Sequence, residues 1–504
     1  MPEEKFFQDR VKALEEIRQA GVQPYAYKFE VTHSSKHVFE QFGDLAEGKS
    51  EESVSVAGRI MLLRNMGKAM FAHIQDFTGR IQLYFRKDDI GDLSFNLLKK
   101  LHVGDIIGVK GKIFRTKTGE LTVYVEELQL LTKSLQQLPE KYHGLHDVEL
   151  RYRQRYVDLI VNPEVREVFL KRAKIIQTIK EILNSKNFIE VETPTLQPIY
   201  GGANARPFIT HHNTLDLKLY LRVSNELYLK RLLVGGFERV YEFVKDFRNE
   251  GIDRTHNPEF TQVEFYCAYG DYNDAMEIVE EIWAKAAMAV CGKTKISYQG
   301  VELDLTPPWE RLSMVDAIKK YAQIDVTGMS IEDMRSYCKK EQIEFDDSLG
   351  RGLLINTIFE EKCEKQLIQP VFIKDFPIET TPLCKPLRGG DGSFVERFEP
   401  YINGWELGNA YSELTDPLLQ RKLLEEQVAR GRAGDEEHHP MDEDFVRAIE
   451  YGMPPAFGVG IGIDRMVMLL TDSVNIRDVI LFPLLRPDEV AKSEETIRNG
   501  QIKT

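Results

Sequence analysis

Five short segments between residues 54 and 131 alternate apolar and polar side chains, and this pattern constrains the fold more strongly than any other feature of the sequence. The segments are VSVAGRIMLL, KAMFAHIQDF, RIQLYF, DIIGVKGKIFR and ELTVYVEELQLL. Alternation with a period of two predicts half-buried β-strands. Five such strands in succession, with glycine at several corners, predict a small closed barrel of the oligonucleotide-binding (OB) type.

The charge of the chain is distributed unevenly. Its formal net charge of −14 by itself argues against a nucleic-acid partner. Residues 54–134, however, contain 13 Lys and Arg against 8 Asp and Glu, so they carry +5 and the rest of the chain carries −19. The predicted barrel is therefore suited to RNA, and the acidic excess belongs to the remaining residues.

The rest of the chain mixes helical and strand patterns. Residues 1–20 have a helical period, Asn162-Pro163 caps a helix that runs to about residue 187, FIEVETP follows as a strand, and RDVILFPLLRP predicts a buried strand. Strands clustered around long helices indicate an α+β domain built on an antiparallel sheet. We expect a helical N-terminal extension (1–53), the OB barrel (54–134), a linker (135–163) and a domain at 164–504 that is mainly helical at about 271–345.

Composition excludes several other classes of protein. The five cysteines are an odd number and are never spaced as C-x-x-C, which argues against a disulfide framework and a zinc site. No apolar run approaches the ~18 residues that span a bilayer, so no membrane partner is expected. The N-terminus MPEEKFFQDR is charged where a secretory signal has an apolar core, so we expect a cytoplasmic protein.

The glycine-rich segment GVGIGIDR (458–465) permits two interpretations. It lacks the G-x-G-x-x-G spacing, and no G-x-x-x-x-G-K-[ST] occurs, so dinucleotide-binding and P-loop folds are poorly supported. The glycines would either allow a helix to pack closely on a strand or leave room for a ligand. In the second case Arg465, near the start of the following helix, would meet its anionic end.

Two strands, RVYEFVKDF and PEFTQVEFYCAYG, are separated by a polar loop at 251–258. A period of two places four side chains on one face of the second strand: Phe260, Gln262, Glu264 and Tyr266. A solvated face would explain the polar pair, but the two aromatic side chains favour a ligand platform. Arg248 ends the first strand, and the polar side chains that follow it suit phosphate.

Asn403-Gly404 is a strong signal for a two-residue hairpin turn. This turn would place Tyr401 opposite Glu406 and make Glu399 a diagonal neighbour of Glu406, about 7–8 Å away between Cα atoms. Two such acids are either exposed on a hairpin or hold a cation, and carboxylates together with substrate phosphates suit Mg²⁺. A bulge at Gly408 would then turn three further residues to the same side: Asn409, Tyr411 and Glu413.

Three segments resemble the motifs of class II aminoacyl-tRNA synthetases. The helix ending in FIEVETP resembles the first motif, KDFRNEG with RTHNPEFTQVEFY the second, and GVGIGIDR with its helix the third. A barrel before the catalytic domain is similar to the lysyl, aspartyl and asparaginyl subgroup. YGGANARPFITHHN, RVSNELYLKRLLVGGFERVYE and ELGNAYSEL resemble the lysyl-tRNA synthetases closely. The resemblance, from about residue 54 to Pro487, implies an antiparallel class II catalytic domain behind an OB-fold anticodon-binding barrel.

The resemblance also implies roles for individual residues. Arg248 and Arg465 would act in catalysis by holding the phosphates of ATP. The ATP site would comprise Arg248, Glu250, His256, Asn257, Phe260 and Arg465, and Mg²⁺ would bind Glu399 and Glu406. L-lysine would be held by Gly202, Glu226, Glu264, Tyr266, Asn409, Tyr411 and Glu413. The anticodon would meet Arg59, Arg64, Phe71, His73 and Gln82, although alternation alone explains Phe71 equally well as barrel core.

Converging carboxylates favour lysine within the subgroup, because an aspartate substrate would need a basic partner and a neutral competitor would leave buried charge unpaired. The expected enzyme joins L-lysine to ATP as lysyl-adenylate, releases pyrophosphate, and transfers lysyl to the 3′ end of tRNA(Lys). The family resemblance implies a homodimer through the first motif. Three features depart from the family pattern: Trp405, Gln262 and TTPLCK at 380–385.

Two alternatives stay open. A paralogue that lysylates a protein would not need an anticodon reader, which argues against it. A catalytically inactive RNA-binding homologue would not need the two arginines and two acids named above for ATP and Mg²⁺.

Overall fold

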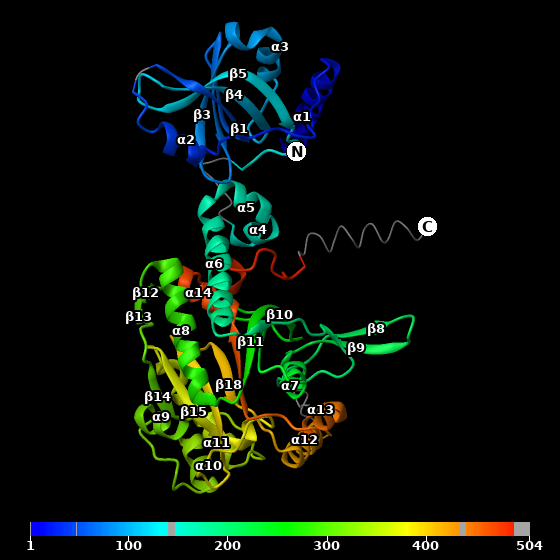
Figure 1. Cartoon of the computed structure of the whole chain (residues 1–504), viewed down its shortest axis with the longest axis vertical. Helices are drawn as coiled ribbons and strands as arrows, with labels where there is room; N and C mark the ends of the chain where they lie inside the picture. The colour runs from blue at the N-terminus through cyan, green and yellow to red at the C-terminus, as the bar shows by residue number, and fades with distance from the viewer. Residues whose placement is uncertain (1, 47, 140–146, 433–439, 488–504) are drawn as a thin grey trace. The chain divides into compact units, whose positions relative to one another are not determined.

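The computed structural model describes residues 2–46, 48–139, 147–432 and 440–487. They belong to two compact units (Figure 1), Met1–His146 and Asp147–Thr504. Each unit has its own apolar core. Among these residues, no helix has both the length and the apolar character that a membrane crossing requires.

The first unit contains the predicted OB barrel, which is confirmed. Its strands close in the order β1-β2-β3-β5-β4, with β3 and β5 parallel and the other pairs antiparallel. The apolar side of the alternating pattern fills the interior, as Met70, Ala72 and Ile74 do on the second strand. The elements are α1 (Pro2–Gln19), α2 (Ser35–Phe42), β1 (Lys49–Asn65), β2 (Ala69–Gln75), β3 (Arg80–Arg86), α3 (Lys87–Lys99), β4 (Ile106–Arg115) and β5 (Leu121–Thr132).

The second unit is built on a nine-stranded sheet and confirms the α+β class. The strand order is β14-β15-β16-β18-β19-β11-β10-β6, and β17 pairs with β16 beside this path. The central pairs are antiparallel, whereas the edge pairs β14/β15 and β10/β6 are parallel. The strands are β6 (Ile189–Glu190), β10 (Arg239–Phe247), β11 (Glu259–Ala268), β14 (Glu310–Ser313), β15 (Val371–Pro377), β16 (Phe394–Ile402), β17 (Trp405–Glu406), β18 (Gly408–Ser412) and β19 (Ala456–Gly462).

Helices cover one face of this sheet. Three of them, α6 (Pro163–Ser185), α8 (Tyr272–Cys291) and α14 (Ile463–Thr471), share a core with Val263 and Phe265 of β11. Since side chains alternate along a strand, Gln262, Glu264 and Tyr266 point to the other face. That face is where the platform predicted on β11 lies.

The remaining elements flank the sheet. A second core joins Val371 and Val395 to α9, α10, α11 and α13, and a small sheet orders its strands as β7-β9-β8, of which β8 and β9 project as a hairpin (Figure 1). The bounds are α4 (Val148–Arg153), α5 (Arg155–Val161), β7 (Leu196–Gln197), β8 (Ile209–His212), β9 (Leu217–Leu221), α7 (Glu226–Val234), β12 (Lys295–Tyr298), β13 (Val301–Asp304), α9 (Met314–Tyr321), α10 (Ile331–Lys340), α11 (Arg351–Lys362), α12 (Pro417–Arg432) and α13 (Glu443–Glu450).

Some sequence-based expectations differ from the structure. The FIEVETP strand is only the two residues of β6, and the segment 271–345 contains three short strands besides its helices. The predicted C-terminal strand is wrong: a 3₁₀ turn (Ile476–Asp478) is followed by irregular chain in which Phe482 is 69% exposed. The buried Arg155 guanidinium donates to three carbonyls of this segment: Arg477 O (2.8 Å), Leu481 O (3.1 Å) and Ile480 O (3.5 Å). In a strand, the N–H groups of a neighbouring strand would have bound such carbonyls.

Candidate active site

A cavity of about 380 Å³ lies on the platform face of the sheet in the second unit. Its walls come from β11, the loop before it, the β16–β18 hairpin, β19 and the start of α14. The predicted site residues that line it are Gly202, Glu226, Arg248, Glu250, His256, Asn257, Phe260, Glu264, Tyr266, Glu406, Asn409, Tyr411 and Arg465. Glu399 and Glu413 are buried and do not belong to this lining.

One end of the cavity is cationic. Arg248 follows β10 directly, and its guanidinium carbon lies 5.0 Å from the centroid of the Phe260 ring. The buried Arg248 Nε has no hydrogen-bond partner in the part of the chain that the structure describes. Arg465 Nη1 donates to Glu406 O (2.7 Å), and Nη2 lies 2.8 Å from His256 Nε2. These groups offer N–H donors to an anion, as phosphate binding requires.

The β10–β11 loop is held in shape by its own side chains. Asn257 Nδ2 donates to Glu259 O (2.6 Å), and His256 Nδ1 lies 2.8 Å from Asp253 Oδ2. Arg248 N donates to Pro258 O (2.9 Å), which closes the loop at its base. The loop therefore presents Arg248 and His256 from a fixed backbone.

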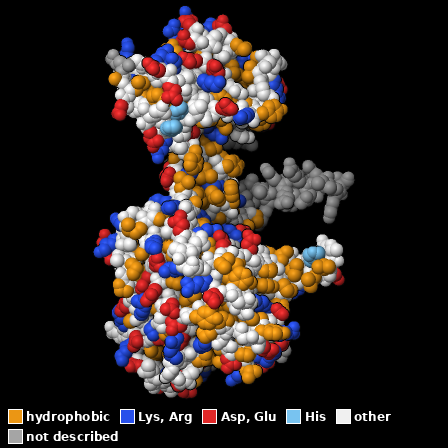
Figure 2. Space-filling model, viewed as in Figure 1, with side chains coloured by type: hydrophobic (Ala, Val, Ile, Leu, Met, Phe, Trp, Pro, Cys, Tyr) orange, Lys and Arg blue, Asp and Glu red, His pale blue; other side chains and the backbone are white. Residues whose placement is uncertain are grey.

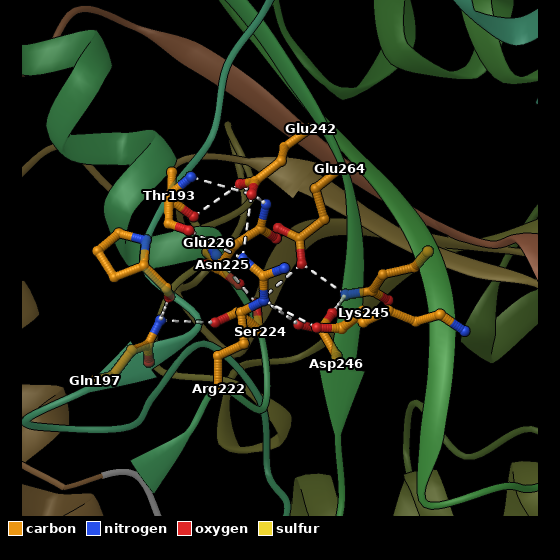
Figure 3. Close-up of polar contacts among 12 residues, drawn as sticks. Thr193, Gln197, Arg222, Ser224, Asn225, Glu226, Glu242, Lys245, Asp246 and Glu264 are labelled. Carbon is orange, nitrogen blue, oxygen red and sulfur yellow. Dashed lines mark hydrogen bonds and ion pairs between the residues drawn. The ribbon is translucent and has the colours of Figure 1, made fainter. Parts of the chain in front are cut away.

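The other end of the cavity is acidic and is lined by Glu226 and Glu264, which Figure 3 shows among their polar neighbours. The Glu264 carboxylate accepts hydrogen bonds from Ser224 Oγ (2.9 Å), Gln262 Nε2 (2.8 Å) and Tyr266 OH (3.1 Å). Burial, with Asp246 and Glu226 nearby, raises the pKa of Glu264 well above its ordinary value. A cationic ligand beside Glu264 would oppose this shift.

A buried lysine that the sequence analysis did not identify lies behind this acidic end. Lys230 Nζ lies 2.5 Å from Glu226 Oε1 and 2.6 Å from Glu413 Oε2, and Tyr411 OH donates a hydrogen bond to Glu226. Burial raises the pKa of Glu413 to about 8, and Lys230 opposes that shift. The i,i+4 spacing of Glu226 and Lys230 on a helix could have predicted their ion pair, but the sequence gives no comparable indication for the pair with Glu413.

A polar network fastens the start of α7 to β10 (Figure 3). Glu242 accepts hydrogen bonds from Thr193 N (3.0 Å), Asn225 Nδ2 (2.7 Å) and Arg222 Nη1 (3.1 Å). Asn225 stands between Ser224 and Glu226 in the chain, so this network fixes the backbone that carries both of them into the site.

The hairpin predicted at Asn403-Gly404 is confirmed. Tyr401 pairs with Glu406, and the turn residues have φ values of 57° and 69°, as a type I′ turn requires. Further along, Arg397 pairs with Tyr411, which is one residue out of register with the first pairing, so the predicted bulge is present. Burial and the nearby Glu406 raise the pKa of Glu399 to about 8.

Arg397 of β16 is a second residue that the sequence analysis missed. Its guanidinium donates to Asn409 Oδ1 (3.0 Å), to Thr380 Oγ1 (3.1 Å) and to Glu399 Oε1 (2.5 Å). It therefore links an acid of the predicted metal site to a predicted lysine-binding residue. The period of two along β16, which puts Arg397 on the same side as Glu399, could have indicated it.

In the first unit, Phe71 lies outside the barrel core and packs against Tyr84, with ring centroids 4.9 Å apart. The interpretation of Phe71 as barrel core is therefore wrong, and its role as an anticodon contact stays a prediction. His73 Nε2 lies 2.9 Å from Glu120 Oε1, and the buried Gln82 donates to Thr122 Oγ1 (2.8 Å). Arg59 Nη1 donates to Gly104 O (2.8 Å), whereas Arg64 is exposed.

Comparisons with known proteins agree with this architecture. Residues 147–486 match the family described as tRNA synthetases class II (D, K and N), and residues 54–131 match the OB-fold nucleic acid binding domain. A lysine–tRNA ligase of Moorella thermoacetica is 54% identical over 95% of this chain and 97% of its own length. Lysine–tRNA ligases of Pelotomaculum thermopropionicum and Nostoc punctiforme are each 53% identical, over 95% and 97% of this chain and 94% and 89% of their own lengths. The chain therefore belongs to the class II tRNA synthetases of the D, K and N group.

Proposed function

We propose that this chain is a lysine–tRNA ligase that activates L-lysine with ATP and transfers lysyl to the 3′ end of tRNA(Lys). The observation that carries the proposal is a single cavity with two arginines at one end and buried carboxylates at the other. Relatives that are more than half identical in sequence bear the name lysine–tRNA ligase.

The acidic end selects lysine in this proposal. Gly202, Glu264, Tyr266, Asn409 and Tyr411 surround the substrate, and Glu226 and Glu413 meet its side-chain ammonium. Gly202 has a φ of 89°, and a Cβ there would lie 2.8 Å from Ser224 Oγ, so only glycine leaves this wall open. A neutral amino acid would leave buried carboxylates without a cation, which disfavours its binding.

The cationic end receives ATP. Phe260 stacks on adenine, Arg248 meets the α-phosphate and the lysine carboxylate, and Arg465 meets the γ-phosphate, while Glu250, His256 and Asn257 complete the site. The unpaired Arg248 Nε supports this assignment, because a buried donor without a partner is expected where a ligand binds.

Glu399 and Glu406 fit a magnesium site. Glu399 is held by Arg397 Nη2 and by Tyr401 OH (2.7 Å), and the proximity of Glu406 adds to the rise in the pKa of Glu399, as expected for two acids that share a cation site. No group of three or more His, Cys, Asp and Glu that could hold a metal ion occurs in the described ranges, so substrate phosphates would complete the coordination. Bound Mg²⁺ would supply positive charge to the phosphates.

The first chemical step needs no general base, because the lysine carboxylate is already ionised. It attacks the α-phosphate, and pyrophosphate departs. Arg248 orients the two reactants, and Arg465 neutralises charge on the leaving group, so the rate enhancement comes from positioning and electrostatics. In the second step the terminal ribose hydroxyl of tRNA attacks the lysyl-adenylate carbonyl and releases AMP.

The barrel reads the anticodon in this proposal. Phe71 stacks on a base, with Arg59, Arg64, His73 and Gln82 around it, and the charge of +5 on residues 54–134 attracts the RNA backbone.

We further propose that the enzyme is a homodimer and works in the cytoplasm, where tRNA is charged for protein synthesis. Large apolar side chains are exposed on the second unit, and Figure 2 shows hydrophobic side chains gathered over α5 and α6. The exposed apolar side chains of the second unit include Tyr156 of α5, Leu170 of α6, Ile189 of β6 and Phe482, and a second copy would bury them.

Exchange of pyrophosphate into ATP, measured with each of the twenty amino acids, tests the activation step. Exchange that depends on lysine is expected. No exchange with any amino acid would exclude the enzyme, and exchange with aspartate alone would exclude the lysine assignment. Charging of tRNA(Lys) then separates this function from lysylation of a protein.

A further inference from the structure

Lys230 is one of the most deeply buried cations of the second unit. Its side chain is 1% exposed, and it projects from α7 between Glu226 of the same helix and Glu413, which follows β18. Burial disfavours the ammonium, but Glu226 and Glu413 outweigh this effect and hold the pKa of Lys230 above its ordinary range. Its Nζ also lies 5.2 Å from the centroid of the Tyr411 ring.

The two carboxylates outnumber the cation that they share. Arg231, the next residue, pairs with Asp442 (2.8 Å), and Lys385 acts on Glu413 less strongly than Lys230 does. Glu413 Oε1 has no hydrogen-bond partner among the described residues, and a Cβ on Gly458 of the cavity wall would lie 2.2 Å from it. The carboxylate oxygen Oε1 of Glu413 therefore lies against the cavity wall at Gly458 and lacks a hydrogen-bond donor.

We infer that Lys230 is a positioning residue that acts as an internal counter-cation and sets the part of the lysine site formed by Glu226 and Glu413 to accept one ammonium group, that of the substrate side chain. The inference rests on the proposed function. With lysine bound, Glu226 and Glu413 carry two negative charges, and these are balanced by Lys230 and by the substrate ammonium. Lys230 acts through the two acids and does not belong to the cavity lining itself.

A purely structural role for Lys230 leads to a different expectation. A lysine that only holds α7 in place would be needed whatever charge Glu413 carries. A lysine that balances charge becomes unfavourable once Glu413 is neutral, because two ammonium groups would then compete for Glu226. The two roles therefore differ in the sign of the coupling between the two positions.

The experiment compares Glu413→Gln, Lys230→Met and the double variant K230M/E413Q in lysine-dependent pyrophosphate exchange. We expect E413Q to raise the KM for lysine by about tenfold or more, with the KM for ATP little changed. In K230M/E413Q one carboxylate faces one ammonium, so the KM for lysine should fall back toward the wild-type value. K230M alone should have a smaller effect than E413Q, because protonation of one carboxyl restores the balance.

Two further variants keep the test decisive. K230Q/E413Q has the same charge balance with a polar side chain and should show the same rescue if the methionine variant folds poorly. Lys285→Met removes the cation of an exposed i,i+4 pair with Glu281 on α8, the same spacing as Glu226 and Lys230, and should leave the KM for lysine unchanged.

A KM for lysine that is as high in both double variants as in E413Q, or higher, would overturn the inference about Lys230. Lysine-dependent pyrophosphate exchange by the wild-type enzyme tests the proposed function separately. If it supports no exchange with lysine, the proposed function fails; if it does, only the role of Lys230 is in question.

Discussion

Each unit buries a lysine against carboxylate, and the two sites differ in charge balance. In the barrel, Lys133 and Asp105 are both fully buried, with Lys133 Nζ 2.9 Å from Asp105 Oδ1. Asp105 also accepts hydrogen bonds from the backbone N–H groups of His102 (2.7 Å) and Ser134 (2.8 Å). In the second unit, Lys230 is shared by Glu226 and Glu413, and Glu413 keeps an unpaired oxygen.

The difference shows how a buried charge serves structure in one place and binding in another. Both carboxylate oxygens of Asp105 are hydrogen-bonded and leave nothing for a ligand to satisfy, so the barrel pair stabilises local structure. An excess of buried carboxylate is costly by itself, and a protein retains it where a ligand supplies the missing charge. Four variants test this distinction between side chains that serve structure and side chains that serve binding.

Lys133→Met should have the largest effect, and the effect should be on stability. Removal of Lys133 takes away the one cation that is hydrogen-bonded to the buried Asp105 among the described residues, which costs about 3–5 kcal/mol of unfolding free energy. Denaturant unfolding of the full chain, with hydrogen exchange followed in β4 and β5, measures this loss. Lysine-dependent pyrophosphate exchange should persist where the second unit remains folded. Unchanged protection of β4 and β5 would show that the barrel pair does not stabilise the unit.

Arg248→Ala should affect activity and leave stability nearly unchanged. The lost guanidinium contacts the reacting groups in the proposed function, so kcat for lysine activation should fall by about 10²–10³-fold. Stability should be preserved because the buried Arg248 Nε has no hydrogen bond to lose. Arg239→Ala, at the opposite end of β10, is the matched control and should retain kcat. A normal kcat in Arg248→Ala would contradict a catalytic role for Arg248.

Glu264→Gln should raise the KM for lysine by about 10–100-fold, because a hydrogen bond to a charged partner is replaced by a neutral one. The stability of the wild type and that of the variant should also depend differently on pH. The pKa of Glu264 is higher in the folded chain than in the unfolded chain, so the wild type loses stability as pH rises from the unfolded value toward the folded one.

Glutamine does not ionise, so the Tm of the Glu264→Gln variant should rise relative to that of the wild type as the pH increases above the ordinary pKa of a glutamate. Melting curves of both proteins across this range provide the measurement. A Tm difference that is constant with pH would contradict a raised pKa at Glu264.

Phe71→Ala should have the smallest effect, and the effect should be confined to tRNA. Loss of one base–aromatic stack costs about 1–3 kcal/mol, so kcat/KM for tRNA charging should fall roughly tenfold or more. Lysine-dependent pyrophosphate exchange without tRNA should be unaffected. Phe77→Ala, an exposed aromatic residue between β2 and β3, provides the control. Equal charging by both variants would argue against Phe71 as an anticodon contact.

Local features of the site could be predicted from sequence. The Asn403-Gly404 turn, the pairing of Tyr401 with Glu406 and the one-residue bulge follow from turn chemistry and the period of two, which involve neighbouring residues. The C-terminal segment shows the limit of the same reasoning. An apolar run is compatible with a strand, but Arg155, far away in the sequence, satisfies its carbonyls instead.

By itself, the sequence determined the OB barrel, the platform strand, the hairpin and the class II motifs, because periodicity, turn residues and motif spacing are short-range properties of the chain. Only the tertiary structure decided that Phe71 lies outside the barrel core and that Arg397 connects Glu399 to Asn409. It also brought Tyr411 and Glu226, 185 residues apart, into contact beside Lys230. Such partnerships depend on which strands and helices pack together, and burial then makes their charge balance matter.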